Sequence, residues 1–159
     1  MNYPRTFIAL LTIAGIGVFA TAIFASNAKA PARRYIEPRL SSGDGTPLPF
    51  SGAVLVGDTL YLSGDIGLEP GNKVPKEATT EVRLLMESFE KRLAAAGMTM
   101  DDLVYVTVYS SDVNDYAVFN AEYRKHFHRE FPARAYIGAG KLLFGARWEM
   151  QGVAVRRRP

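Results

Sequence analysis

Residues 79–96 carry the pattern that most restricts the fold, because their apolar side chains recur every three or four positions. This spacing places them on one face of an α-helix. The helix is expected to begin at Thr79 or Thr80 and to end at Ala96, with caps at both ends and Gly97 terminating it. Its apolar stripe consists of Val82, Leu85, Met86, Phe89, Leu93 and Ala96.

The remaining segments predict strands and one more helix around this element. Two apolar runs joined by Gly57 and Asp58 predict a hairpin, and alternating valines predict a third strand. The order ββαβαββ predicts an α+β domain with two helices packed on one face of a mixed β-sheet. The expected segments are 53–56 and 59–63 for the hairpin, 104–109 for the valine strand, 115–127 for the second helix, and 135–139 and 148–155 for the closing strands.

Large apolar side chains are spread over both faces of the predicted strands. Two helices can cover only one sheet face, so the aromatic residues favour self-association through the other face. The alternative is that they are ordinary half-buried residues at the strand ends. The residues concerned are Leu55, Tyr61, Leu62, Tyr105, Tyr109, Tyr136 and Trp148.

The N-terminal segment has the features of a targeting sequence. Residues 7–25 carry no charge, follow Arg5, and are succeeded by Ala28-Lys29-Ala30, which fits a signal-peptidase site. We expect a signal peptide over residues 1–30 and export to the periplasm or outside the cell. The alternative is an uncleaved membrane anchor, since a spanning helix needs roughly 20 apolar residues.

The rest of the chain divides into an arm and a domain. Residues 31–49 are rich in Pro, Gly and Ser and are expected to be extended, with one short strand around Tyr35. The compact domain is expected over residues 50–159.

Charge and ligand chemistry exclude several functions. Without residues 1–30 the chain holds 17 basic and 16 acidic residues, and its basic excess lies mainly at the two ends, which are expected to be solvated. This distribution does not predict nucleic-acid binding. The chain has no Cys and only His126 and His128, so no metal-ligand pattern is present.

Arg134 is the first candidate for ligand binding, because it follows Phe131-Pro132-Ala133 at the entry of an apolar segment. A guanidinium presents donors in a fixed fork that matches a carboxylate, and it stays charged at physiological pH.

Several motifs, in order, resemble the reactive intermediate deaminase family, the RidA/YjgF group. They extend over about residues 49–157 and comprise Tyr61-Leu62-Ser63-Gly64, Ala95-Ala96-Gly97, Asp101-Asp102-Leu103-Val104, 111–116, 119–123, Phe131-Pro132-Ala133-Arg134 and 149–155. The resemblance implies a chorismate-mutase-like homotrimer with clefts between subunits. It also implies hydrolysis of enamine or imine intermediates of amino acids to 2-keto acids and ammonia, without metal or organic cofactor.

The resemblance assigns roles to four positions. Arg134 matches the arginine that clamps the substrate carboxylate, and Asn120 matches an asparagine near the cleft. Ser63 and Gly64 match the strand end that borders the cleft, where glycine permits close approach of the backbone.

Three positions depart from the family pattern. Phe50 replaces a tyrosine, Tyr136 replaces a small residue or cysteine, and Gln151 falls where the carboxylate that orients water is expected. A neutral amide can position water but cannot accept its proton. Glu149, on the same strand face as Gln151, and Asp65, after Ser63 and Gly64, are the acids that could compensate.

Two functions remain open from the sequence. In the first, an exported deaminase of the cell envelope binds substrate through Arg134, Asn120, Ser63, Gly64, Phe50 and Tyr136, while Gln151, Asp65 and Glu149 serve catalysis. In the second, a non-catalytic trimer binds a small carboxylate ligand through Arg134. Contact with a membrane is expected only through residues 7–25, if they are retained.

Overall fold

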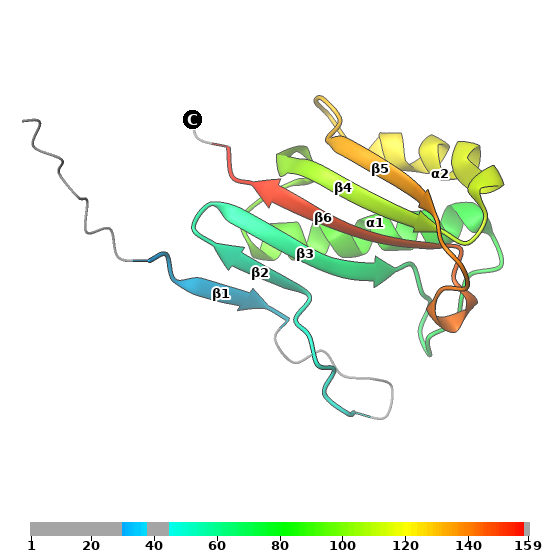
Figure 1. Ribbon diagram of the computed structural model, residues 1–159, viewed down its shortest axis with the longest axis horizontal. Helices are drawn as coiled ribbons and strands as arrows, with labels where there is room; N and C mark the ends of the chain where they lie inside the picture. Colours follow the sequence, from blue (N-terminus) through cyan, green and yellow to red (C-terminus); the bar gives the residue numbers. More distant parts are fainter. Residues whose placement is uncertain (1–29, 38–44, 158–159) are drawn as a thin grey trace, which may run out of the picture. The chain divides into compact units, whose positions relative to one another are not determined.

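The computed structural model describes residues 30–37 and 45–157, which form a six-stranded mixed sheet and two helices (Figure 1). The predicted signal peptide therefore lies outside the described residues, except for Ala30. In chain order the elements are β1 Arg33–Ile36, β2 Ala53–Val56, β3 Thr59–Ile66, α1 Ala78–Ala95, β4 Leu103–Ser110, α2 Tyr116–Tyr123, β5 Ala133–Gly138 and β6 Trp148–Val155.

The strands follow the order β1-β2-β3-β6-β4-β5, and β4 and β5 are the parallel pair among otherwise antiparallel neighbours. Both helices pack on one face of the sheet, as predicted (Figure 1). The strand expected around Tyr35 is β1, which pairs with β2 and extends the sheet. Within the described residues, no helix combines the length and apolar character needed to cross a membrane.

Helix α1 begins slightly earlier than predicted. Its N-cap is Glu77, whose side chain makes no capping hydrogen bond, so the prediction of a threonine cap was wrong. The C-terminal prediction is confirmed, because Gly97 has a φ of +71° and its N–H donates to the carbonyl of Ala94 at 2.8 Å. Glycine adopts this left-handed conformation without a side-chain penalty.

Arginines near the chain ends complete this helix terminus, although the sequence predicted them to be solvated. Arg156 donates to the carbonyls of Ala96 at 2.7 Å and Gly97 at 2.9 Å, and Arg34 donates to that of Ala95 at 3.0 Å. Cations are favourable here because the last carbonyls of a helix carry partial negative charge.

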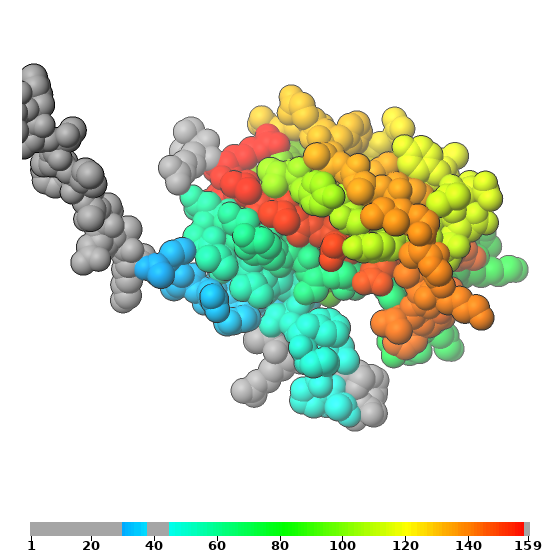
Figure 2. Space-filling view, in the orientation of Figure 1, coloured from blue at the N-terminus to red at the C-terminus, as the bar shows by residue number. Residues whose placement is uncertain are grey.

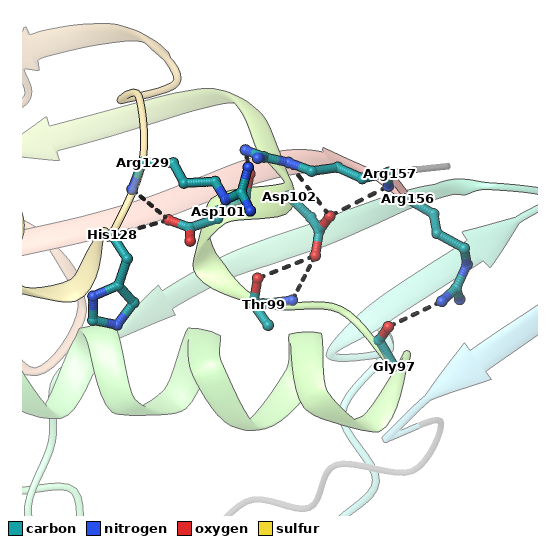
Figure 3. Close-up of polar contacts among 8 residues, drawn as sticks. All are labelled: Gly97, Thr99, Asp101, Asp102, His128, Arg129, Arg156 and Arg157. Carbon is teal, nitrogen blue, oxygen red and sulfur yellow. Dashed lines mark hydrogen bonds and ion pairs between the residues drawn. The ribbon is translucent and has the colours of Figure 1, made fainter. Parts of the chain in front are cut away.

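Two aspartates before β4 fix neighbouring segments (Figure 3). Asp102 accepts from the Thr99 N–H at 2.7 Å and the Arg157 N–H at 3.3 Å, and Asp101 accepts from the His128 N–H at 2.9 Å. These acids therefore hold both the C-terminal segment and the loop after α2.

The second helix is shorter than the predicted span of 115–127. α2 covers Tyr116–Tyr123 and is flanked by 3₁₀ turns at Val113–Asp115 and Arg124–His126. Its inward residues Phe119 and Tyr123 are buried.

The sheet face opposite the helices is uncovered and carries aromatic side chains. Figure 2 shows β3, β6, β4 and β5 side by side at the surface, without a helix over them. Strand register aligns Tyr35, Val54, Tyr61, Val153, Tyr105 and Ala133 in one row across the sheet. Tyr35, Tyr61 and Tyr105 are about half exposed, whereas Leu62 and Trp148 are buried under the helices. Only part of the predicted aromatic set therefore belongs to this open face.

An ion pair between a buried glutamate and a partly exposed arginine joins the start of α1 to the start of β6. Glu81 has no exposed surface and accepts hydrogen bonds from the backbone N–H groups of Arg147 at 2.6 Å and Trp148 at 3.2 Å. The Arg147 guanidinium lies 2.7 Å from the same carboxylate. This contact sets the position of the first residues of β6.

Replacing Glu81 by Gln is expected to lower the free energy of unfolding by about 2 kcal/mol, because the buried carboxylate accepts hydrogen bonds through both oxygens and an amide offers only one acceptor oxygen. Urea unfolding measures the effect. Glu87→Gln is the matched control on the same helix, because Glu87 pairs with Arg83 at the surface. Loss of this surface ion pair should lower the free energy of unfolding by less than about 0.5 kcal/mol. Equal effects of the two substitutions would contradict the assigned role of Glu81.

Candidate functional site

Arg134 lies on β5 and points toward α2, into a set of aromatic rings. Its Cζ is 4.7 Å from the ring centroid of Tyr123 and 5.7 Å from those of Tyr116 and Phe119. One nitrogen, Nη2, donates to Oδ1 of Asn120 at 2.6 Å. Aromatic faces attract a guanidinium electrostatically, so the rings and the amide hold it in one orientation.

Two tyrosines beside Arg134 have shifted pKa values. Burial raises the pKa of Tyr123 to about 12, against the opposing effect of the Arg134 charge. Hydrogen bonding to Asn120, and then the charge of Arg134, lowers the pKa of Tyr116. The Tyr123 hydroxyl oxygen is buried without a hydrogen-bond partner among the described residues.

A cavity of about 320 Å³ opens beside this arginine. Tyr116, Asn120, Tyr123, Arg124, Phe131, Pro132 and Arg134 line it. In the part of the chain that the structure describes, Arg134 forms no ion pair. A cation in an aromatic pocket without a carboxylate partner is suited to bind a small anion.

A second group of polar residues lies on the open sheet face, around an irregularity in β3. Leu62 pairs with Gly152 and Asp65 with Met150, so Ser63 and Gly64 together stand opposite Gln151. This two-against-one pairing is a β-bulge, a feature that often redirects side chains near binding sites.

Glu149 lies against this bulge. A Cβ atom at Gly64 would come within 2.1 Å of the Glu149 Oε1, so glycine is what permits the carboxylate to approach the backbone. Burial, and then the charge of Asp65, raises the pKa of Glu149. Such a carboxylate exchanges protons closer to neutral pH than an ordinary glutamate does.

Gln151 and Ser63 are held in place by neighbours. The Gln151 Nε2 donates to the Tyr109 hydroxyl at 3.1 Å, and the Ser63 hydroxyl donates to the carbonyl of Ser51 at 2.6 Å. The predicted common face of Glu149 and Gln151 is confirmed, because both alternate with the buried residues of β6. Gln151 lies on the surface, while Glu149 is partly buried.

Within one chain these two groups face opposite sides of the sheet. On β4, Val106 pairs with Arg134 and Thr107 pairs with Gln151. Successive residues of a strand point to opposite faces, so Arg134 faces α2 while Gln151 faces the open side. The structure thus brings Arg134 and Asn120 together, and separately Ser63, Gly64, Glu149 and Gln151.

Asp65 does not face Gln151, contrary to the expectation that it could replace a catalytic acid there. It accepts a hydrogen bond from the Ser88 hydroxyl and lies 2.8 Å from Nη1 of Arg92, both on α1. The bulge causes this reversal, because the extra residue moves Asp65 to the helix-covered face.

Tyr136 and Phe50 also differ from the expected substrate contacts. The Tyr136 hydroxyl donates to Ser110 at 3.0 Å and accepts from the Trp148 indole at 2.9 Å, so it belongs to the interior polar contacts. The centroid of the Tyr136 ring lies 5.8 Å from the Arg134 Cζ, while its hydroxyl is engaged in these interior hydrogen bonds. Phe50 is exposed just before β2.

Sequence reasoning missed four residues that shape these sites. Tyr116 and Tyr123 appeared only as members of a helix stripe, although their spacing from Asn120 places all three on neighbouring positions of one helix face. Tyr109 and Arg92 gave no local signal, because their partners come from distant strands.

Among residues 30–37 and 45–157, no group of three or more acidic or histidine side chains is arranged to hold a metal ion. The fold and its polar groups define a class of protein: an α+β domain with an arginine suited to bind an anion at a sheet edge and a partly buried carboxylate at a bulge on the opposite face. The family model described as Endoribonuclease L-PSP matches residues 45–156, and the chain belongs to this family. The resemblance to the RidA/YjgF group is thereby confirmed.

Named relatives and solved structures agree with this assignment. A human 2-iminobutanoate/2-iminopropanoate deaminase is 36% identical over 110 residues, which cover 68% of this chain and 80% of the human protein. The crystal structure of yeast Mmf1 matches with a TM-score of 0.69 and 28% identity, over 79% of this chain and 100% of Mmf1. RidA from an Antarctic Psychrobacter matches with a TM-score of 0.68 and 25% identity, over 77% of this chain and 99% of that protein.

Proposed function

We propose that this protein hydrolyses 2-imino acids, or their enamine tautomers, to 2-keto acids and ammonia. The observation that carries the proposal is Arg134, a guanidinium held by aromatic rings and Asn120 beside a small cavity. The deaminase named among the relatives supports the same substrate class. RNA cleavage, which the family description names, has less support, because a cavity of about 320 Å³ suits a small carboxylate better than a chain of phosphates.

Arg134 would bind the substrate carboxylate through the N–H groups that Asn120 does not engage. Two parallel N–H···O bonds fix both the position and the rotation of the carboxylate. The adjacent imine carbon is then held at a defined distance from the pocket wall. Positioning of this kind lowers the barrier without a covalent intermediate.

Glu149 would transfer the protons of the hydrolysis. Its carboxylate takes a proton from water while the water oxygen bonds to the imine carbon, and the C=N electron pair moves to nitrogen. The same carboxyl group then gives that proton to the nitrogen, which yields a carbinolamine. The carboxylate next takes the proton of the new hydroxyl and passes it to the amino nitrogen, so that the C–N bond breaks, the carbonyl forms and ammonia leaves. Gln151, anchored to the Tyr109 hydroxyl, would hold the water or the substrate.

The two halves of the site would meet between two copies of the chain. Arg134 faces α2 near the edge strand, whereas Glu149 lies on the open face, so a second copy docked on that face would bring them together. The row of exposed tyrosines on the open face supports burial by another subunit. The proposed assembly is a homotrimer, and its proposed location, if residues 1–30 are a signal peptide, is the periplasm or the cell exterior.

One observation favours a second candidate function, a non-catalytic protein that binds a small carboxylate. The Arg134 cavity is lined by residues of one chain, and Glu149 is not among them. Binding could therefore occur without the proton-transfer group.

The test is release of 2-keto acid and ammonia from 2-imino acids that an amino-acid oxidase generates in place. We expect the purified protein to accelerate hydrolysis above the spontaneous rate, and mass measurement in solution to give three copies. A trimer that binds 2-keto acids without accelerating hydrolysis would contradict the deaminase proposal and favour the carboxylate-binding function.

A further inference from the structure

A buried arginine on α1 links the N-terminal arm to the bulge that carries the proposed site. The Arg92 side chain is only 7% exposed, and its Nη1 lies 2.8 Å from Oδ2 of Asp65. Its Nε donates to Oε2 of Glu37 at 2.8 Å, just after β1. One guanidinium therefore pairs with two carboxylates, one on β3 and one just after β1.

The position of Glu37 is specific to this contact. Its φ of 49° is unusual for a residue other than glycine. A Cβ at Gly52 would lie 2.3 Å from Glu37 Oε2 and 2.9 Å from Arg92 Nε, so the absence of a side chain there makes room for the pair.

Asp65 connects this pair to Glu149. The two acids belong to neighbouring strands, with Asp65 opposite Met150 and Ile66 opposite Glu149. Asp65 points to the helix face and Glu149 to the open face, but the Glu149 carboxylate lies against the backbone of Gly64, the residue before Asp65. After burial, the Asp65 charge is the second cause that raises the pKa of Glu149. Arg92 is thus the cation that pairs with Asp65, the acid whose charge affects the pKa of Glu149.

We propose that Arg92 is a positioning residue for the hydrolysis, because its ion pair holds Asp65 on the helix face of the bulge and leaves the open side of Gly64 to the Glu149 carboxylate. The inference rests on the proposed function of Glu149. The inference assigns a role to Arg92, which is remote from the substrate. It also implies that Glu37, in the N-terminal arm, competes with Asp65 for the Arg92 guanidinium.

Charged and titratable groups around Glu149 come from each neighbouring strand. Asp65 lies on β3 and points to the opposite face, Tyr109 is the register partner of Glu149 on β4, and Gln151 is the next open-face residue on β6. Around Asp65 lie Ser88 and Arg92, of which only Arg92 carries a positive charge. Removing Arg92 leaves the Asp65 charge unbalanced beside Glu149, and like charges disfavour ionisation.

The experiment compares Arg92→Met, Asp65→Asn and the double variant in the full chain. The Glu149 carboxyl is titrated by ¹³C NMR, and the pH profile of kcat/KM for imine hydrolysis is measured in parallel. Arg83→Met is the matched control, because Arg83 lies on the same helix and pairs with Glu87 at the surface.

Arg92→Met is expected to raise the pKa of Glu149 by about one pH unit and to move the acidic limb of the profile to higher pH. Asp65→Asn should lower the pKa of Glu149 and move the acidic limb to lower pH. The double variant should give the same values as Asp65→Asn. In Arg92→Lys, the pKa of Glu149 and the pH profile should stay near those of the parent protein. In Arg83→Met, both quantities should be unchanged.

Several outcomes would overturn the inference. An Arg92→Met shift that persists in the double variant would show that Asp65 does not mediate it. An unchanged Glu149 titration in a folded Arg92→Met variant would also refute it. If Arg92→Met fails to fold, Asp65→Asn still decides, because a Glu149 pKa that does not fall would contradict the coupling. The titration needs no turnover, so a protein that shows the shifts without hydrolysis would refute the proposed function alone.

Discussion

Replacing Glu149 by Gln is expected to lower kcat/KM for imine hydrolysis by about 10²–10⁴-fold, the usual contribution of a positioned general base or acid. Glutamine keeps the size and hydrogen-bonding capacity of the side chain but cannot accept or release a proton. The substitution removes no ion pair, so the protein should remain folded. Steady-state hydrolysis with oxidase-generated imines measures the effect.

Gln151→Glu tests the residue on the same strand face that we propose holds the water or the substrate. A glutamate there is solvated and still accepts hydrogen bonds from water, so kcat/KM should fall much less than in Glu149→Gln, by less than about tenfold. A loss of activity in Gln151→Glu with none in Glu149→Gln would transfer the catalytic role to the amide.

The proposed role of Glu149 as the base predicts how imine hydrolysis depends on pH. If Glu149 acts as the base, activity requires its carboxylate form and falls as pH drops through its pKa. Burial and Asp65 raise that pKa, so the acidic limb should lie above the pH at which an ordinary glutamate titrates. The acidic limb should disappear from the residual activity of Glu149→Gln.

Replacing Arg134 by Ala is expected to lower kcat/KM about 100-fold or more, because two charge-assisted hydrogen bonds to the substrate carboxylate are lost. Arg134→Lys keeps the charge but not the planar fork, so it should recover only part of the loss. Binding of a 2-keto acid product, measured by calorimetry, should weaken most in Arg134→Ala and less in Arg134→Lys.

Arg124→Ala is the control for general charge in the cavity. Arg124 lines the same cavity, but its Nε donates to the backbone carbonyl of Asn120 at 3.2 Å. We expect a change of less than about tenfold. Equal losses in the two variants would show that the cavity attracts anions only by its charge, without a specific clamp at Arg134.

Local patterns were sufficient for most of the fold. The predicted closing strand 148–155 coincides with β6, and the end of α1 at Gly97 follows from one residue that tolerates positive φ. These features depend on side-chain periodicity and on backbone preference, both of which are properties of short segments. The start of α1 was less predictable, since Glu77 and not a threonine precedes its first turn.

The site was only partly predictable. Arg134 and Asn120 were identified as candidates, and the structure joins them by a hydrogen bond. Asp65 was a candidate for the acid that Gln151 cannot supply, because it follows Ser63 and Gly64. The bulge at Ser63 and Gly64 breaks the alternation of faces along β3 and directs Asp65 toward α1, and nothing in the local sequence pattern predicts it.

By itself, the sequence therefore determined the class of fold and the order of its elements. It also identified Arg134 and Asn120 as side chains suited to bind a carboxylate. Those conclusions rest on local periodicity and on the chemistry of single side chains. Only the tertiary structure decided that Arg134 and Glu149 face opposite sides of the sheet, that Arg92 holds Asp65, and that Gly64 admits the Glu149 carboxylate. These facts depend on strand register and on contacts between residues far apart in the chain, where one inserted residue reverses the face on which a side chain lies.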